Sequence, residues 1–356
     1  MKEKLVTVFG TRPEIIRLSR ILPKLDDTFE HISINTYQNF LPNLNDIFLD
    51  QLKIRQPDYN LKISHKNYGQ EIGDIIRQTH EILLKEKPDK LLILGDTYSC
   101  LSVMPASNLG IKIYHMEAGM RSGDFKIPEE KNRKIVDHLS TINLPYTEYS
   151  RQNLIREGLD PKKIFVTGNP IIEVLNHYNS EIEKSTILKK FEKDYVLVTM
   201  HRHENVTDPI TLTNVMKAVD NISRKYQVIF FAHPRLLEAL EKHKIRALPN
   251  VRLRKTVGFF DFVKLQKNAK CVLSDSGTVP EECAYLKVPC ITLRNVTERQ
   301  EFVDLGTNTV VGTKSHSKIF DAVQRAISSN YEWKWNETLG DGKTSERVIR
   351  ILEGVL

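Results

Sequence analysis

Cysteine is scarce in this chain, and no pair of cysteines has a spacing that would hold a metal. The four cysteines are Cys100, Cys271, Cys283 and Cys290. They form no Cys-x-x-Cys pair, and no histidine/cysteine spacing fits zinc. Buried thiols in a reducing compartment are the simpler interpretation. The sequence therefore predicts an enzyme without a metal and with a cytoplasmic location.

A long apolar run is missing as well. No stretch of 18 or more apolar residues occurs, which argues against a transmembrane helix. The first ten residues combine a charged lead with only a short apolar stretch, so they predict a buried strand rather than a signal peptide. We expect no membrane association.

The basic residues do not cluster, although they outnumber the acidic ones. The net charge is +7, from 52 basic and 45 acidic side chains. There is no arginine-rich arm and no ladder of aromatic and basic residues, so we expect no nucleic-acid partner. An anionic small-molecule substrate needs only a few of these positive charges.

Motifs that bind dinucleotides or ATP are also missing. The first expected strand is followed by Gly10-Thr11-Arg12-Pro13, which differs from the Gly-x-Gly-x-x-Gly of dinucleotide folds. No Walker motif occurs either. The sequence predicts no cofactor.

Short apolar runs alternate with amphipathic helical stretches along the chain. The expected strands are 5–9, 90–94, 112–116, 163–166, 195–199, 228–232, 271–273, 290–293 and 309–311. Such alternation predicts an α/β fold, with parallel sheets covered by helices on both faces. A length of 356 residues suits two domains. We predict Rossmann-like domains at 1–168 and 169–335, and a C-terminal helix in 336–356 that packs back on the first domain.

Polar residues follow the expected strands at the carboxyl ends, where parallel sheets bind ligands. Asp96 and Glu117 come directly after two strands, and Glu129 lies in the next loop. If they are buried near each other, their pKa values would split into acid and base roles, whereas isolated loop carboxylates would simply be solvated. His201 and His233 follow two later strands and could be general acids, phosphate ligands or core histidines.

The loop Asp275-Ser276-Gly277-Thr278 directly precedes an expected helix. Its backbone N–H groups and the helix dipole would favour a phosphate, although Asp275 and Ser276 could simply cap the helix. The arginines that could neutralise a diphosphate are Arg12, Arg294 and Arg299. Of three phenylalanines ahead of this loop, one could stack on a base, but core packing is the simpler alternative.

Taken together, several motifs resemble the non-hydrolysing UDP-N-acetylglucosamine 2-epimerase family. They are Gly10-Thr11-Arg12-Pro13-Glu14, Gly95-Asp96-Thr97, residues 116–124, Pro128-Glu129-Glu130-Lys131-Asn132-Arg133, residues 166–169, His201-Arg202-x-Glu204-Asn205, Asp275-Ser276-Gly277, Glu281-Glu282 and Thr297-Glu298-Arg299. The similarity runs from residue 6 to about 313 in order and spacing. It implies a glycosyltransferase-B-like fold, with UDP in the cleft between the domains, and a homodimer.

The resemblance also implies a reaction and a set of site residues. Members of the family eliminate UDP from the sugar nucleotide to give a 2-acetamidoglucal, then add UDP back with a proton on the other face of carbon 2. The matching positions assign proton transfer to Asp96, Glu117 and Glu129 and place His201 beside the diphosphate. The positions implied for binding a UDP-sugar are Arg12, Arg17, His233, Phe262, Ser276, Gly277, Thr278, Glu282 and Arg299.

Two departures from the family pattern bear on regulation and substrate. The family's Thr-Gly-Gln-His, which in bacterial members helps to hold a second, activating UDP-sugar, is Thr36-Tyr37-Gln38-Asn39 here. Tyr37 adds bulk and restricts the backbone, so we expect no activation. Asn39 and Thr278 are closer to capsule and O-antigen relatives that act on UDP-2-acetamido-2,6-dideoxyhexoses or UDP-diacetamido uronic acids, whereas Arg121-Ser122-Gly123-Asp124 is closer to the main branch of the family.

Three alternatives to a UDP-N-acetylglucosamine or close UDP-2-acetamido sugar epimerase stay open. A hydrolysing epimerase would share the fold but release free sugar and UDP. A glycosyltransferase would share the two-domain architecture but need an acceptor. A catalytically silent sensor of sugar nucleotides is the third, and the three intact carboxylates argue against it.

Overall fold

The chain divides into two compact units, which the computed structural model describes over residues 2–38, 42–232, 234–245, 249–329 and 331–354. Unit 1 consists of Met1–His177 and Asn336–Leu356, and unit 2 consists of Tyr178–Trp335. Within the described residues, no helix is long and apolar enough to cross a membrane.

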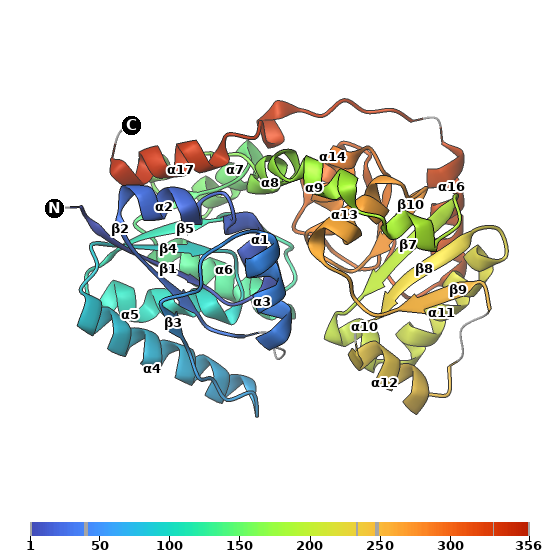
Figure 1. The fold of residues 1–356 in the computed structure, drawn as a ribbon, viewed down its shortest axis with the longest axis horizontal. Helices are drawn as coiled ribbons and strands as arrows, with labels where there is room; N and C mark the ends of the chain where they lie inside the picture. The colour runs from blue at the N-terminus through green and yellow to red at the C-terminus, as the bar shows by residue number, and fades with distance from the viewer. Residues whose placement is uncertain (1, 39–41, 233, 246–248, 330, 355–356) are drawn as a thin grey trace. The chain divides into compact units, whose positions relative to one another are not determined.

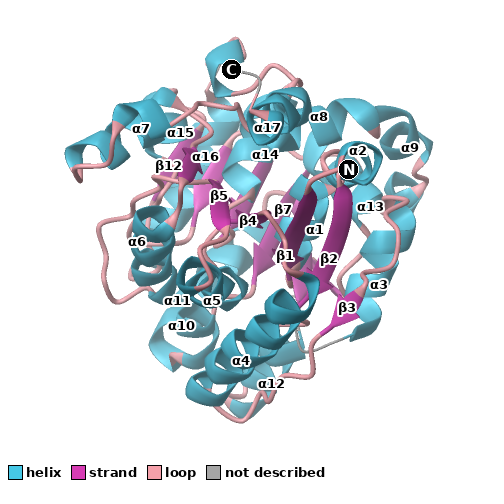
Figure 2. Cartoon of the chain, turned by 90° about the vertical axis from the view of Figure 1, so that its left-hand side faces the viewer, coloured by secondary structure: helices cyan, strands magenta, loops and turns pink. Residues whose placement is uncertain are grey.

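Unit 1 contains a six-stranded parallel sheet (Figure 1) in the order β3-β2-β1-β4-β5-β6. Its strands are β1 (Lys4–Phe9), β2 (Glu30–Asn35), β3 (Tyr59–Asn60), β4 (Lys90–Leu94), β5 (Lys112–Met116) and β6 (Ile142–Leu144). Its helices are α1 (Arg12–Leu18), α2 (Leu22–Thr28), α3 (Pro42–Gln51), α4 (Tyr68–Glu86), α5 (Val103–Asn108), α6 (Pro128–Leu139), α7 (Glu148–Arg156), α8 (Pro170–His177) and α17 (Thr344–Glu353). The helices α4, α5 and α6 pack together on one face of the sheet (Figure 2), over a core that includes Val6, Val8 and Leu91.

Unit 2 repeats this architecture with the sheet order β12-β11-β10-β7-β8-β9. Its strands are β7 (Tyr195–Met200), β8 (Gln227–Ala232), β9 (Val251–Arg254), β10 (Cys271–Ser274), β11 (Cys290–Thr292) and β12 (Asn308–Val310). Its helices are α9 (Asn179–Lys184), α10 (His203–Thr207), α11 (Pro209–Ser223), α12 (Pro234–Lys242), α13 (Phe259–Lys267), α14 (Val279–Leu286), α15 (Gln300–Asp304) and α16 (His316–Ser328). Alternate residues of β7 enter opposite cores: Val196 and Val198 pack in one, and Tyr195 and Leu197 in the other. Both faces of this strand are therefore covered, as expected for a parallel sheet between helix layers.

In both units the strands follow the order of a Rossmann fold, 3-2-1-4-5-6 when numbered within each unit. The predicted α/β class with two Rossmann-like domains is confirmed. In this topology ligands bind outside the carboxyl ends of the strands, where the strand order reverses. These places lie after β1 and β4 in unit 1, and after β7 and β10 in unit 2.

The chain crosses from unit 1 to unit 2 after His177, whereas the sequence places the boundary after residue 168. Helix α8 stays with unit 1 because its apolar face, including Ile171 and Leu175, is buried and the helix contacts α1 and α17. The C-terminal segment returns to unit 1, where Glu173 accepts a hydrogen bond from the backbone N–H of Ser345 at 2.8 Å.

One expected strand, residues 163–166, is wrong. Pro161 opens a short 3-10 turn, and beyond it Ile164 makes only an isolated bridge to Asn143. The strands β2, β3, β6 and β9 were not predicted. All four are short or half-exposed strands at or next to a sheet edge, so their apolar pattern is weak.

Candidate active site

Asp96 lies in the turn after β4, and two residues of α6 hold it in place. Gly95 takes a left-handed backbone with φ of +79°, which a glycine adopts without steric cost. Helix α6 then supplies two partners: Arg133 donates to one carboxylate oxygen of Asp96 from Nε at 3.0 Å and Nη2 at 2.5 Å, and Asn132 donates to the Asp96 carbonyl at 2.9 Å. Both the backbone and the carboxylate of Asp96 are therefore fixed.

Burial and the neighbouring charges together shift the pKa of Asp96. Burial raises the pKa of Asp96, Arg133 lowers it, and the negative charges of Glu117 and Glu129 raise it again, with a net increase. Both glutamates are therefore close enough to Asp96 for their charges to act on it. Such mutual repulsion keeps one member of a group protonated while another is ionised, which acid/base chemistry requires.

Glu117 directly follows β5, and its backbone is strained. Its backbone is left-handed, with φ of +67°, and its side chain is 10% exposed. The hydroxyl of Tyr146 donates to Glu117 Oε2 at 3.3 Å, and Arg17 Nη1 lies 3.7 Å from the same oxygen. The structure brings Arg17 to this carboxylate, a neighbour that sequence reasoning assigned to nucleotide binding.

Glu129 lies in the first turn of α6 and is half-buried. Its neighbour Glu130 is buried and turns inward, where it pairs with Arg133 at 2.7 Å and accepts from the Ser122 N–H at 2.9 Å. Arg133 thus links Glu130 to Asp96. Sequence reasoning gave no role to Arg133 or Tyr146; the available signal for Arg133 was its position three and four residues after two glutamates on one helix.

The first turn of α1, shortly after β1, carries Arg12 and a buried glutamate, Glu14. Glu14 accepts hydrogen bonds from the N–H groups of Gly10 at 2.6 Å and Thr11 at 2.9 Å, and from the Thr97 hydroxyl at 2.6 Å. Burial nevertheless raises the pKa of Glu14 to about 7. Glu14 therefore ties the start of α1 to the turn that follows Asp96. Arg12 is half-buried, and its guanidinium lies 5.7 Å from the Phe48 ring centroid.

In unit 2, Asp275 organises the loop that holds His201. The buried Asp275 carboxylate accepts from the backbone N–H groups of His201 at 3.1 Å and Arg202 at 2.9 Å, and His201 Nδ1 lies 3.2 Å from it. Although burial acts to raise the pKa of Asp275, His201 and these hydrogen bonds lower it below its ordinary value. The His201 side chain remains 43% exposed, so it is free to meet a ligand.

Residues 276–278 lead directly into α14. Ser276 and Thr278 are half-buried and share a hydroxyl–hydroxyl hydrogen bond of 3.1 Å. A Cβ at Gly277 would collide with the Glu298 carboxylate, so a larger residue at this position would require the Glu298 side chain to move. Arg299 is almost fully buried, donates a hydrogen bond to the Gly277 carbonyl at 3.2 Å and forms an ion pair with Glu281. The positive charge of Arg299 therefore lies next to the 276–278 loop.

Two further residues that the sequence predicts to contact the UDP-sugar lie in unit 2. Glu282 is buried and accepts from Gln266 Nε2 at 2.8 Å. Phe262 is half-buried, and its ring meets Phe231 edge-on at a centroid distance of 6.0 Å. The remaining prediction, His233, lies outside the described residues. Arg294 forms an ion pair with Glu298 at 2.8 Å.

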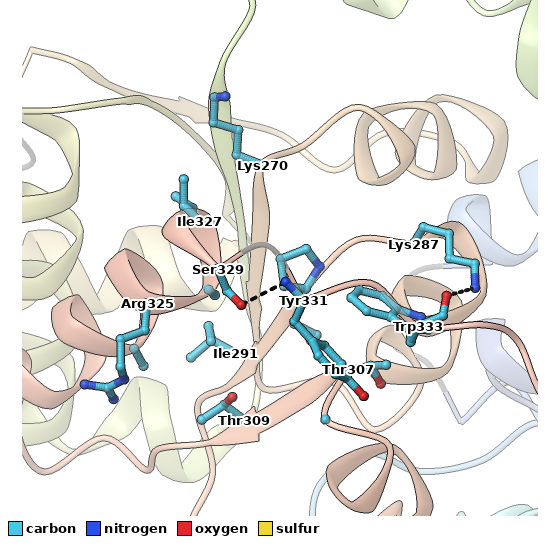
Figure 3. Close-up of a pocket in the computed structure, with 15 residues that line it drawn as sticks. Lys270, Lys287, Ile291, Thr307, Thr309, Arg325, Ile327, Ser329, Tyr331 and Trp333 are labelled. Atoms are coloured by element: carbon cyan, nitrogen blue, oxygen red, sulfur yellow. Dashed lines mark hydrogen bonds between the residues drawn. The ribbon is translucent and has the colours of Figure 1, made fainter.

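A cavity of about 390 Å³ lies elsewhere in unit 2 (Figure 3). Lys270, Pro289 and Thr307 line it, and each precedes a strand, so the cavity opens at the amino ends of β10, β11 and β12. Tyr331 and Trp333 stack beside it at a centroid distance of 6.0 Å. None of the predicted site residues lines this cavity, because they follow strands at the opposite edge of the sheet.

Among the described residues, no group of three or more histidine, cysteine, aspartate or glutamate side chains could hold a metal ion. What the two units do offer is different in kind. Unit 1 presents three neighbouring carboxylates suited to proton transfer. Unit 2 presents an exposed histidine and a glycine-containing loop at a helix start, which suit an anion.

Known proteins match this chain over nearly its whole length. The family model described as UDP-N-acetylglucosamine 2-epimerase matches residues 24–353. A Methanocaldococcus jannaschii protein named UDP-N-acetylglucosamine 2-epimerase is 39% identical and covered to 98%, as is this chain. A Pseudomonas aeruginosa protein named UDP-2,3-diacetamido-2,3-dideoxy-D-glucuronate 2-epimerase is 32% identical over 98% of this chain and 99% of its own length. The solved structure of the Methanocaldococcus jannaschii UDP-GlcNAc 2-epimerase in complex with UDP-GlcNAc and UDP has a TM-score of 0.92 at 38% identity and covers 99% of both chains.

Proposed function

The chain belongs to the UDP-N-acetylglucosamine 2-epimerase family, and we propose that it inverts carbon 2 of UDP-N-acetylglucosamine or a close UDP-2-acetamido sugar. The observation that carries this proposal is the group of carboxylates in unit 1. Asp96 forms an ion pair with Arg133, and the negative charges of Glu117 and Glu129 raise its pKa. Asp96 and Glu117 follow two parallel strands and Glu129 lies in the first turn of α6, and we propose that these carboxylates supply both an acid and a base.

The chemistry follows from the acidity of the substrate. The proton on carbon 2 of an intact sugar is not acidic, so a base cannot remove it directly. Departure of UDP from carbon 1 gives an oxocarbenium-like state, from which loss of that proton yields a 2-acetamidoglucal. The C1–O bond breaks, its electron pair leaves with UDP, and a carboxylate takes the proton. Re-addition of UDP with a proton on the opposite face gives the epimer.

We propose that unit 2 stabilises the departing UDP. Negative charge develops on the diphosphate as the C1–O bond breaks, and fixed donors are most effective at such a place. His201 is exposed, and the 276–278 loop starts a helix with Arg299 behind it. The side chains Glu282 and Phe262 are the proposed contacts to the nucleoside.

The relatives support a range of UDP-sugars rather than one. One is named for UDP-N-acetylglucosamine and another for a UDP-diacetamido glucuronate. UDP-N-acetylglucosamine is our first choice because the more similar of these two carries that name. A homodimer and a cytoplasmic location stay predictions.

An isotope experiment in heavy water tests the mechanism. UDP-N-acetylglucosamine incubated with the protein should yield an epimerised UDP-sugar that carries one deuterium at carbon 2, read by mass spectrometry and NMR. The oxygen between carbon 1 and the diphosphate should also exchange with non-bridging positions. Epimerised product without deuterium at carbon 2 would show that elimination and re-addition do not occur.

The same experiment separates the alternatives. A hydrolysing epimerase would place the deuterium in free sugar. A glycosyltransferase or a silent sensor would give neither labelled product without an acceptor. No turnover of any UDP-2-acetamido sugar would reject the proposed function as a whole.

A further inference from the structure

The turns that carry Asp96 and Glu117 leave neighbouring strands, and both use left-handed backbone. The φ angle is +79° at Gly95 and +67° at Glu117. Strands β4 and β5 pair in parallel, and the Gly95 N–H donates to the Met116 carbonyl at 3.1 Å. A left-handed φ costs a residue other than glycine about 1 kcal/mol or more. Glu117 keeps this conformation only because its surroundings hold the turn.

A buried histidine lies between the two turns. His115 in β5 places Nε2 2.9 Å from the Gly95 carbonyl oxygen and Nδ1 2.8 Å from Asp137 Oδ1 in α6. The Asp137 carboxylate in turn accepts from the Gly119 N–H at 3.3 Å. A carbonyl oxygen can only accept, so Nε2 carries a hydrogen and donates it. The His115–Asp137 pair therefore reaches both turns through hydrogen bonds.

This pair sits in a closed setting. His115 and Asp137 are both fully buried. Arg121 Nη2 lies 2.8 Å from Asp137 Oδ2, and Arg121 Nε donates to Glu157 at 2.9 Å. Buried polar groups that are fully paired form rigid networks, because each lost partner leaves an unsatisfied group in a low dielectric. The pair thus has little freedom to move, and it is too deep to meet a substrate.

We propose that His115 and Asp137 are positioning residues that hold the Asp96 turn and the Glu117 turn in one relative geometry. This rests on the proposed function, in which those two carboxylates move protons at carbon 2. A displacement of about 1 Å at a reacting group can lower a rate by about a hundredfold. Substrate binding is proposed to depend mainly on unit 2, so the pair should affect turnover and leave binding alone.

Two substitutions of the same residue separate its two hydrogen bonds. His115→Asn places its amide near the position of Nδ1, so it keeps Asp137 and loses the Gly95 carbonyl. His115→Gln places its amide near the position of Nε2, so it keeps the Gly95 contact. We expect kcat to fall by about tenfold or more in His115→Asn and by less than about threefold in His115→Gln, with KM within about twofold in both.

The matched control is a second buried histidine in the same sheet. His31 in β2 has Nδ1 2.6 Å from Asp26 and Nε2 3.0 Å from the Thr7 hydroxyl, away from either turn. His31→Asn should destabilise unit 1 in a similar way and leave kcat unchanged. A wild-type kcat in His115→Asn, or an equal loss of kcat in His31→Asn, would overturn the proposal.

A second measurement does not depend on turnover. Asp137→Asn keeps the shape of the side chain but weakens the link to His115, so hydrogen exchange of the 95–99 segment should speed up by about fivefold, the factor for one lost buried hydrogen bond. Unchanged exchange in this segment would show that the turns are not coupled through the pair. If the wild-type protein does not epimerise at all, the proposed function fails, and the exchange result still decides the coupling.

Discussion

Arg133 donates two hydrogen bonds to a single oxygen of Asp96, from Nε at 3.0 Å and Nη2 at 2.5 Å. This contact opposes the burial and the like charges that raise the pKa of Asp96. Arg133→Gln should therefore raise that pKa further, and the acidic limb of the kcat/KM profile should move to higher pH by about one unit. Arg133→Lys, which keeps the charge but not the fork, should shift it less.

The control for this shift is Arg151→Gln, which breaks an exposed pair with Glu148 on α7. It should leave the pH profile unchanged. A profile in Arg133→Gln that overlays the wild type would mean that Asp96 is not the group that titrates there.

Removing the charge of each proposed acid or base should stop turnover without unfolding the protein. Asp96→Asn, Glu117→Gln and Glu129→Gln should each lower kcat by at least about a hundredfold, the lower end for proton transfer by a positioned side chain. The changes are nearly isosteric, so circular dichroism and melting temperature should stay close to the wild type. Near-normal turnover in Asp96→Asn and Glu117→Gln together would contradict the acid/base assignment.

His201 should contribute to binding of UDP as well as to its departure. Its side chain is 43% exposed, so His201→Ala should fold normally. We expect UDP affinity, measured by calorimetry, to fall by about tenfold, as for one lost hydrogen bond to a charged group. His243→Ala in the same unit is the control. Unchanged affinity in both His201→Ala and Arg299→Lys would place the diphosphate elsewhere.

Tyr37 keeps a left-handed backbone, with φ of +52°, although it is not glycine. Its N–H donates to Asn35 Oδ1 at 3.0 Å, which supports this turn. The difference from the family's glycine is therefore the added side chain. We expect hyperbolic kinetics with UDP-N-acetylglucosamine in the wild type and sigmoidal kinetics in Tyr37→Gly. Sigmoidal kinetics in the wild type would show that Tyr37 does not close the second sugar-nucleotide site.

Glu14 should make stability depend on pH. Because burial raises its pKa from 4.5 to about 7, the folded protein binds more protons than the unfolded chain across this window. Stability from this group is therefore present below pH 4.5 and lost as pH rises through 7, by up to about 3 kcal/mol. Glu14→Gln should remove most of this dependence in urea unfolding at pH 5 and pH 8, whereas the exposed control Glu148→Gln should keep it. Parallel pH dependence in wild type and Glu14→Gln would reject the assignment.

Much of the architecture could be predicted from the chain because its signals are local. The buried strands β1, β4 and β7 are short runs of branched and apolar residues, and α4 shows the spacing of one buried helix face. Residues that directly follow such strands, Asp96 and Glu117 among them, were recognised as candidates for the same reason. Weakly patterned edge strands and the 163–166 segment were misassigned, because their conformation depends on neighbours rather than on periodicity.

The pairing of side chains lay beyond the reach of local pattern. Asp96 meets Arg133 across 37 residues, Glu117 meets Tyr146 across 29, and His201 meets Asp275 across more than seventy. Motifs in the chain name the carboxylates and the histidine, but strand order and the docking of α6 select their partners. Those partners set burial and local charge, and burial and charge set the pKa of Asp96. The chain alone therefore names the candidate groups for the chemistry, and the packed fold decides how strongly Asp96 holds its proton.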